Sequence, residues 1–129
     1  MVGMVVISHS EKIAAGTIDL VKQMAPNLPI FPAGGTSDGR IGTEMDLIMQ
    51  AMEQANQGDG VILLVDLGSA VMSAQLAMEM LPDIQPVAIA NGPIVEGAVV
   101  GGVEAEIGGS FERVMEVIEM AGQMEKVKA

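Results

Sequence analysis

Residues 61–69 read VILLVDLGS, and this stretch decides the fold. Its first five residues form a continuous apolar run, which is typical of a strand buried on both faces at the centre of a parallel sheet. A glycine-rich turn at residues 58–60 precedes the run, and the loop that begins at Asp66 ends it. We therefore expect a buried strand over residues 61–65 with a loop directly after it.

Two further apolar runs, at residues 2–7 and 30–33, lie upstream and are predicted to be strands. A helix separates them, with Ser10 as its N-cap and with Pro26 and Pro29 after its end. Its apolar face is expected to consist of Ile13, Thr17, Leu20, Val21 and Met24. Short strands that alternate with helices in this way indicate βαβ units on a parallel sheet.

Two further helices flank the central run. Thr43 opens the first of them, and Thr43 and Asp46 have the spacing of a capping box. The apolar stripe of this helix is expected to consist of Met45, Ile48, Met49, Met52 and Ala55. The second helix is predicted to run to about residue 81, with an inward face of Val71, Ala74, Met78 and Leu81.

The last third of the chain repeats this alternation. Residues 86–90 are predicted to form a fourth strand, and a helix rich in small residues follows from about Pro93. Gly108 and Gly109 separate it from a last helix, whose apolar face is expected to consist of Phe111, Val114, Met115, Ile118 and Ala121. Because no repeat or domain boundary is visible, residues 1–129 are expected to form a single domain.

The composition narrows the classes of partner. The formal net charge is −11, and such an acidic surface repels nucleic acid and anionic membranes, so we expect neither as a partner. The chain has no cysteine and one histidine, which argues against a metal site and fits a cytoplasmic protein. Only 2% of the residues are aromatic, so stacking surfaces for flavins or bases are nearly absent and no cofactor is expected.

The carboxyl edge of the sheet is where open α/β folds bind their ligands. The four segments expected at this edge are residues 8–10, 34–42, 66–69 and 91–93. The first segment contains the only histidine, His9, and the third contains an isolated acid, Asp66. If the first and third strands are neighbours, these two side chains meet.

Together, His9 and Asp66 have the chemistry of a phosphoryl acceptor. A neutral imidazole attacks phosphorus with one ring nitrogen when a carboxylate holds the other nitrogen and stabilises the charge that develops. Amides and hydroxyls near helix N-termini then bind the phosphoryl oxygens. The candidate phosphate-binding residues are Ser10, Thr36, Gly68 and Ser69, and Arg40 is a candidate contact to the phosphate or to a partner.

Each of these residues also has a structural interpretation. A lone histidine is more often a structural or surface group than a nucleophile. Asp66 by itself is typical of a helix cap for the residues from Ser69 onward, and Arg40 is typical of a solvated residue. The loop at residues 34–42 lacks the lysine of a nucleotide-binding phosphate loop, and no dinucleotide-binding glycine motif follows the first strand.

The segment Gly-Met-Val-Val-Ile-Ser-His-Ser at residues 3–10 resembles the phosphorylated-histidine strand of mannose-type enzyme IIA domains of the sugar phosphotransferase system. Within that family, the phosphotransfer subunits of phosphotransferase-dependent dihydroxyacetone kinases match better. The supporting motifs are Ala-Gly-Gly-Thr at 33–36, Asp-Gly-Arg-Ile-Gly-Thr at 38–43, Asp-Leu-Gly-Ser-Ala at 66–70 and Asn-Gly-Pro-Ile-Val-Glu-Gly at 91–97. Together they cover almost the whole chain.

The resemblance implies a three-layer α/β sandwich, in which helices cover both faces of a mainly parallel four-stranded sheet of order 2-1-3-4. It implies a homodimer in which His9 accepts a phosphoryl group from the histidine phosphocarrier protein. The group then passes to ADP on the nucleotide-binding subunit of dihydroxyacetone kinase. Asp66 becomes the acid that orients His9, with Thr36, Gly68 and Ser69 on the phosphate side.

Two other functions remain open. A IIA domain that feeds a mannose-type sugar permease would use the same histidine, whereas a non-catalytic small-molecule-binding module would not use it. The motifs at residues 38–43 and 66–69 favour the kinase subunit. In the helix after Pro93, the candidate dimer contact consists of the small residues Gly97, Ala98, Gly101 and Gly102.

Overall fold

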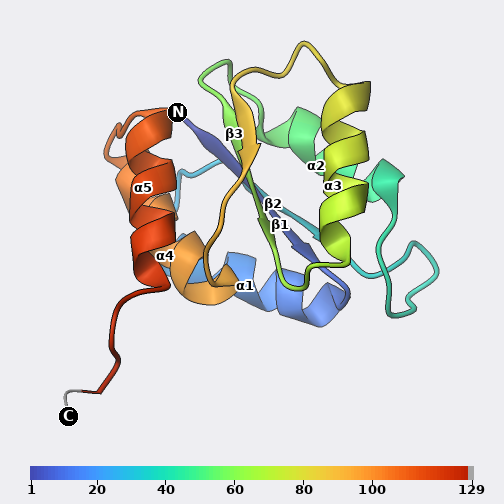
Figure 1. Cartoon of the computed structure of the whole chain (residues 1–129), viewed down its shortest axis with the longest axis horizontal. Coiled ribbons are helices and arrows are strands. Elements are labelled where there is room, and N and C mark those ends of the chain that lie inside the picture. Colours follow the sequence, from blue (N-terminus) through green and yellow to red (C-terminus); the bar gives the residue numbers. More distant parts are fainter. Residues whose placement is uncertain (128–129) are drawn as a thin grey trace.

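The computed structural model describes residues 1–127, so the last two residues of the domain expected over 1–129 lie outside the described residues. Within residues 1–127, four parallel strands and five helices form three layers (Figure 1). The strands are β1 (Gly3–Ser8), β2 (Ile30–Gly34), β3 (Val61–Val65) and β4 (Val87–Ile89). The helices are α1 (Glu11–Met24), α2 (Met45–Ala55), α3 (Ala70–Met80), α4 (Ile94–Glu106) and α5 (Phe111–Ala121).

The strand order is β2-β1-β3-β4 and each pairing is parallel, which confirms the expected fold class. Helices α1, α4 and α5 cover one face of the sheet, and α2 and α3 cover the other (Figure 1). Met4 and Val6 of β1 pack with the first group, whereas Val5 and Ile7 pack with the second. This burial on both faces explains why the two central strands are apolar almost throughout.

The buried face of α1 differs from the prediction. The buried stripe consists of Ala14, Thr17 and Val21, while the exposed apolar residues are Ile13, Leu20 and Met24. Thr17 and Val21 are buried as predicted, and α4 packs closely on this stripe, since a Cβ atom at Gly102 would lie 2.9 Å from the Val21 side chain. Between closely packed helices, the size and shape of a side chain matter as much as its hydrophobicity.

The predicted capping box of the second helix is wrong. α2 begins at Met45, and its N-cap residue, Glu44, makes no side-chain cap hydrogen bond. Instead, the Glu44 carboxylate accepts hydrogen bonds from the amide and the hydroxyl of Ser37. The hydroxyl of Thr43 lies 3.4 Å from the hydroxyl of Ser73 in α3. Tertiary contacts therefore take the place of the local cap.

The other helices follow the predicted patterns more closely. In α2 the buried residues are Ile48, Ala51, Met52 and Ala55, with Met45 and Met49 partly buried beside them. In α3 they are Ala70, Ala74 and Ala77, with Met78 and Leu81 packed against the same core and Val71 only partly buried. In α5 they are Val114, Ile118 and Ala121, with Phe111 and Met115 alongside, as predicted.

The small residues of α4 pack inside the chain. A Cβ atom at Gly101 would lie 2.6 Å from the Ile118 side chain of α5, and Gly102 faces α1. Gly97 and Ala98 are also buried. The absence of side chains lets α4 approach its neighbouring helices closely, so these four residues are not available for the dimer contact expected from the sequence.

Candidate functional site

The carboxyl ends of β1 and β3 bring His9 and Asp66 together. The two strands pair up to Ile7 and Val65, and the Asp66 amide then donates to the Ile7 carbonyl at 3.1 Å. Nδ1 of His9 lies 3.0 Å from Oδ1 of Asp66. The histidine side chain is 22% exposed and the aspartate side chain 13%, so the pair lies at the edge of the sheet with one side open to solvent.

The carboxylate of Asp66 accepts four hydrogen bonds. Oδ1 accepts from the His9 ring at 3.0 Å and from the Leu67 amide at 2.8 Å. Oδ2 accepts from the His9 amide at 3.0 Å and from the Ser8 hydroxyl at 2.9 Å. Partial burial raises the pKa of Asp66, but these hydrogen bonds outweigh burial and hold the pKa below its usual value. The acid is therefore ionised at neutral pH, and its orientation is fixed through both oxygens.

These contacts distinguish the two ring nitrogens of His9. An ionised carboxylate only accepts hydrogen bonds, so in the neutral ring Nδ1 carries the proton that it donates to Asp66. Nε2 then carries the lone pair, and it accepts a hydrogen bond from the hydroxyl of Ser69, the residue before α3, at 3.0 Å. Nε2 is consequently the nitrogen with nucleophilic character, and Ser69 is adjacent to any group that would bind there.

The backbone of His9 is held from both neighbouring strands. Its amide donates to Asp66, which follows β3, and its carbonyl accepts from the amide of Gly42 at 2.9 Å, in the loop after β2. The Gly35 amide of the same loop donates to the Ser8 carbonyl at 3.0 Å. Backbone hydrogen bonds thus fasten the glycine loop to the end of β1.

Two predicted site residues, Thr36 and Arg40, make their polar contacts within this loop. The Thr36 hydroxyl accepts from the Arg40 amide at 2.9 Å, and Arg40 Nε donates to both carboxylate oxygens of Asp38 at 3.0 and 2.8 Å. Hydrogen bonds from Thr36 and then Arg40 hold the pKa of Asp38 below its usual value. Among the described residues, neither Thr36 nor Arg40 has a hydrogen bond to the His9 ring.

The remaining predicted residues flank the pair in the chain. Ser10 is the N-cap of α1, and its hydroxyl accepts from the Ile13 amide at 3.3 Å, which confirms the predicted cap. Gly68 lies in the loop between β3 and α3, and its carbonyl accepts from the Val71 amide at 3.1 Å. The structure therefore places Ser69 in contact with the His9 ring, and Ser10 and Gly68 beside the contacting residues.

The geometry does not support the interpretation of Asp66 as a helix cap. The N-cap residue of α3 is Ser69, and no side-chain cap hydrogen bond is present there. Between β3 and α3, the Asp66 carboxylate accepts a hydrogen bond only from the amide of Leu67, which precedes the helix. Its other three hydrogen bonds come from the end of β1.

Ser8 belongs to this network, although the sequence analysis did not identify it as a site residue. Its side chain is fully buried, and its hydroxyl donates to Asp66 and accepts from the Ser10 amide at 3.0 Å. A signal was present in the sequence, because a polar residue ends an apolar strand directly before the only histidine. Its contact with Asp66 follows only from the pairing of β1 with β3.

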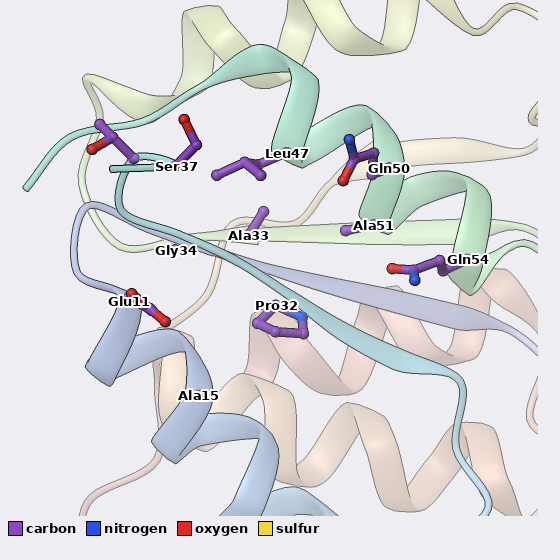
Figure 2. Close-up of a pocket in the computed structure, with 11 residues that line it drawn as sticks. Glu11, Ala15, Pro32, Ala33, Gly34, Ser37, Leu47, Gln50, Ala51 and Gln54 are labelled. Carbon is purple, nitrogen blue, oxygen red and sulfur yellow. The ribbon is translucent and has the colours of Figure 1, made fainter. Parts of the chain in front are cut away.

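A hollow of about 320 Å³ lies between α1 and α2 along the edge strand β2 (Figure 2). Pro32 of β2 lies between the two helices, and the Gln50 side chain projects from α2 toward the hollow. Thr36 lines this hollow, but His9 and Asp66 do not. The histidine and the acid therefore lie outside it, at the exits of the two central strands.

Within residues 1–127, no group of three or more histidine, cysteine, aspartate or glutamate side chains is arranged to hold a metal ion. In the same part of the chain, no helix combines the length and the apolar character needed to cross a membrane. The chemistry available at the sheet edge is that of an imidazole, a carboxylate and neighbouring hydroxyls.

Residues 3–115 match the model of the family described as PTS system fructose IIA component. The chain is 38% identical over 117 residues to the Lactococcus lactis protein "PTS-dependent dihydroxyacetone kinase, phosphotransferase subunit DhaM", covering 91% of this chain and 93% of that protein. It is 44% identical over 96 residues to the Listeria innocua "PEP-dependent dihydroxyacetone kinase 1, phosphoryl donor subunit DhaM", covering 74% and 75%. Its 35% identity to the Escherichia coli phosphoryl donor subunit DhaM covers 89% of this chain and 26% of that longer protein.

Solved structures share the same architecture. The crystal structure of a protein of unknown function, EF1359, superimposes with a TM-score of 0.83 at 27% identity, and the match covers 98% of both chains. A sigma-54 interaction domain protein from Enterococcus faecalis superimposes with a TM-score of 0.69 at 16% identity, covering 95% of this chain and 90% of that one. At that identity, the second likeness concerns the fold alone.

Proposed function

The chain belongs to the PTS system fructose IIA component family, and from this premise we propose that it is a phosphoryl donor subunit of a PEP-dependent dihydroxyacetone kinase. The names of the Lactococcus and Listeria relatives, which match along most of their own length, support this proposal. We also propose that residues 1–129 act as one cytoplasmic phosphocarrier domain and that the chain assembles as a homodimer.

In the proposed first transfer, Nε2 of His9 attacks the phosphorus of a phosphohistidine on the histidine phosphocarrier protein. The bond between Nε2 and phosphorus forms while the donor's nitrogen–phosphorus bond breaks, and the donor imidazole leaves with that electron pair. The His9 ring becomes positive, and Asp66 stabilises the charge through Nδ1. The observation that carries the proposal is the hydrogen-bonded Nδ1 together with the lone pair of Nε2 on a partly exposed ring.

In the proposed second transfer, the group leaves His9 for ADP bound on the nucleotide-binding subunit of the kinase. A terminal phosphate oxygen of ADP attacks the phosphorus, the bond from Nε2 to phosphorus breaks, and ATP forms. The ring returns to its neutral form with Nδ1 still bound to Asp66. One arrangement of the pair therefore serves both transfers, and the mechanism needs no metal or cofactor on this chain.

The proposed phosphate contacts differ in how close they lie to Nε2 of His9. The Ser69 hydroxyl already lies beside Nε2, so it donates to a phosphoryl oxygen after a small rotation. The Gly68 amide and the Ser10 hydroxyl lie next to residues of the contact network. The Thr36 hydroxyl is engaged within the glycine loop, whereas the exposed Arg40 side chain bonds to Asp38 through Nε and is proposed to contact the phosphate or a partner through its other donors.

The proposal is tested by measuring the intact mass of the chain after incubation with phosphoenolpyruvate, enzyme I and the histidine phosphocarrier protein. We expect the mass of one phosphoryl group to be added and to be lost in mild acid, as for a phosphohistidine. The matched control omits only the histidine phosphocarrier protein. An unchanged mass in the complete mixture would refute the phosphocarrier function and favour a non-catalytic binding module.

The acceptor is tested with the phosphorylated chain, isolated from its donor. Addition of the ADP-loaded nucleotide-binding subunit is expected to remove the phosphoryl group and to produce ATP. Addition of a mannose-type permease with its sugar is expected to leave the group in place. The opposite pair of results would assign the chain to a sugar permease instead.

A further inference from the structure

We propose that Ser8 is a positioning residue that acts through the carboxylate of Asp66 to set the tautomer of His9. The inference rests on the proposed phosphocarrier function for its kinetic consequence, although the tautomer itself is a property of the unphosphorylated chain. Ser8 cannot touch a donor or an acceptor protein, because its side chain is fully buried.

The Ser8 hydroxyl accepts one hydrogen bond and donates another, and the roles are fixed by its two neighbours. Its Oγ accepts from the Ser10 amide at 3.0 Å, at the start of α1, and an amide only donates. The hydroxyl proton is therefore directed to the other neighbour, which is Oδ2 of Asp66 at 2.9 Å. With 0% of Ser8 exposed, water does not compete for either contact.

The donation from Ser8 helps to fix the orientation of the Asp66 carboxylate beside the ring. Oδ2 accepts from Ser8 and from the His9 amide, so Oδ1 remains for the ring nitrogen Nδ1. Rotation of the carboxylate would break several of these hydrogen bonds at once, and a buried donor left without a partner is unfavourable. The proton of the neutral ring is thereby held on Nδ1, which leaves Nε2 as the nucleophile.

A purely structural role for Ser8 predicts a different result from a positioning role. Loss of a structural hydroxyl lowers the free energy of unfolding but leaves the His9 tautomer as it is. Loss of a positioning hydroxyl changes the tautomer and lowers kcat, while KM for the donor protein stays the same because Ser8 lies beneath the surface.

The first measurement is the ¹⁵N NMR spectrum of the imidazole in the unphosphorylated chain, where a single histidine removes any ambiguity. In the wild type we expect the Nδ1–H tautomer, and in Ser8→Ala a measurable population with the proton on Nε2. Ser8→Thr keeps a hydroxyl and is expected to restore the wild-type spectrum. The matched control is Thr17→Val, which removes the hydroxyl of the other polar residue that is buried within residues 1–127. That hydroxyl bonds to the Ile13 carbonyl and not to Asp66.

The second measurement is the rate of phosphoryl transfer from the histidine phosphocarrier protein. Ser8→Ala is expected to lower kcat about tenfold without a change in KM, because one hydrogen bond to a charged group is lost. Ser8→Thr and Thr17→Val are expected to remain near the wild-type rate.

A Ser8→Ala chain with a wild-type tautomer and a wild-type kcat would overturn the inference. If Ser8→Ala does not fold, Ser8→Cys takes its place, because a thiol has a similar shape but is only a weak hydrogen-bond donor. A measurable population with the proton on Nε2 in Ser8→Cys supports the inference, and a wild-type tautomer with a wild-type kcat overturns it. A wild-type chain that accepts no phosphoryl group refutes the proposed function, while the tautomer of Ser8→Ala still decides the role of Ser8.

Discussion

The end of β3 and the loop after β2 both lie at the carboxyl edge of the sheet, yet their polar side chains bond in different ways. Asp66, after the central strand, bonds to groups of His9 and Ser8 that are far away in sequence. Thr36 and Arg40, after the edge strand, bond to residues of their own loop, and Arg40 is 75% exposed. A central strand has a neighbour on each side and therefore places its exit with more precision than an edge strand does.

The largest effect is expected from His9→Ala, which tests whether the pair of His9 and Asp66 is the site of phosphoryl acceptance. The variant is expected to lose all phosphoryl acceptance, because no other imidazole exists in the chain. Label incorporated from radioactive phosphoenolpyruvate measures the loss, and circular dichroism checks that the fold is retained. Label that persists in the variant would move the reaction away from the exits of β1 and β3.

The next effect is expected from Asp66→Asn, which keeps the shape of the side chain and removes its charge. An amide nitrogen that faces Nδ1 favours the wrong tautomer, and the positive ring loses its counter-charge, so we expect transfer to slow by about 100-fold or more. Single-turnover kinetics with the phosphorylated donor measures this rate. A rate equal to that of the wild type would reduce Asp66 to a structural residue.

Gly34→Ala tests the packing between the end of β2, where the glycine loop begins, and the start of α1. A Cβ atom at this position would lie 2.8 Å from the Glu11 Cα atom and 2.9 Å from the Ser10 carbonyl oxygen, so the backbone must shift. We expect the free energy of unfolding to fall by about 2 kcal/mol, as measured by urea denaturation. The control is Gly16→Ala in α1, where an added Cβ atom would meet nothing within 4 Å apart from the nearby helix backbone and where alanine is favoured over glycine. Equal effects of the two substitutions would show that the junction is not tightly packed.

The pH dependence of the unfolding free energy tests how much the charge of Asp66 stabilises the fold. The folded-state pKa of Asp66 lies below its unfolded-state value, so the stabilisation by Asp66 is present above the unfolded-state pKa and is lost as the pH falls through the lower folded-state pKa. The difference in unfolding free energy between the wild type and Asp66→Asn should therefore shrink as the pH falls below about 4. A difference that does not vary with pH would contradict the lowered pKa.

The smallest effect is expected from Arg40→Ala. Its ion pair with Asp38 is exposed, so we expect the free energy of unfolding to change by no more than about 0.5 kcal/mol. Urea denaturation checks this value. A loss of several times that size would show that the loop depends on its side chains for stability as strongly as the exits of the central strands do.

The sequence predicted the elements better than the faces that they bury. The strand over residues 61–65 agrees with β3, and the strand expected over 2–7 is displaced by one residue in β1. The predicted buried face of α1 was right for Thr17 and Val21 and wrong for Ile13, Leu20 and Met24, because the stripe that faces the core in the folded chain runs through Ala14, Thr17 and Val21. The cap at Thr43 was wrong because Glu44 and Thr43 bond to other segments instead of to their own helix.

Local patterns in the sequence therefore determined the strands, most of the helices, the Ser10 cap and the candidacy of His9 and Asp66. These features depend on the periodicity of apolar residues and on contacts within a few residues. Only the tertiary structure decided that Ser8 is buried against Asp66, that Nδ1 faces the acid and Ser69 faces Nε2, and that the α4 glycines serve internal packing. Each of these depends on groups brought together by the parallel pairing of β1 with β3 or by helix packing, and sequence spacing does not encode such distances.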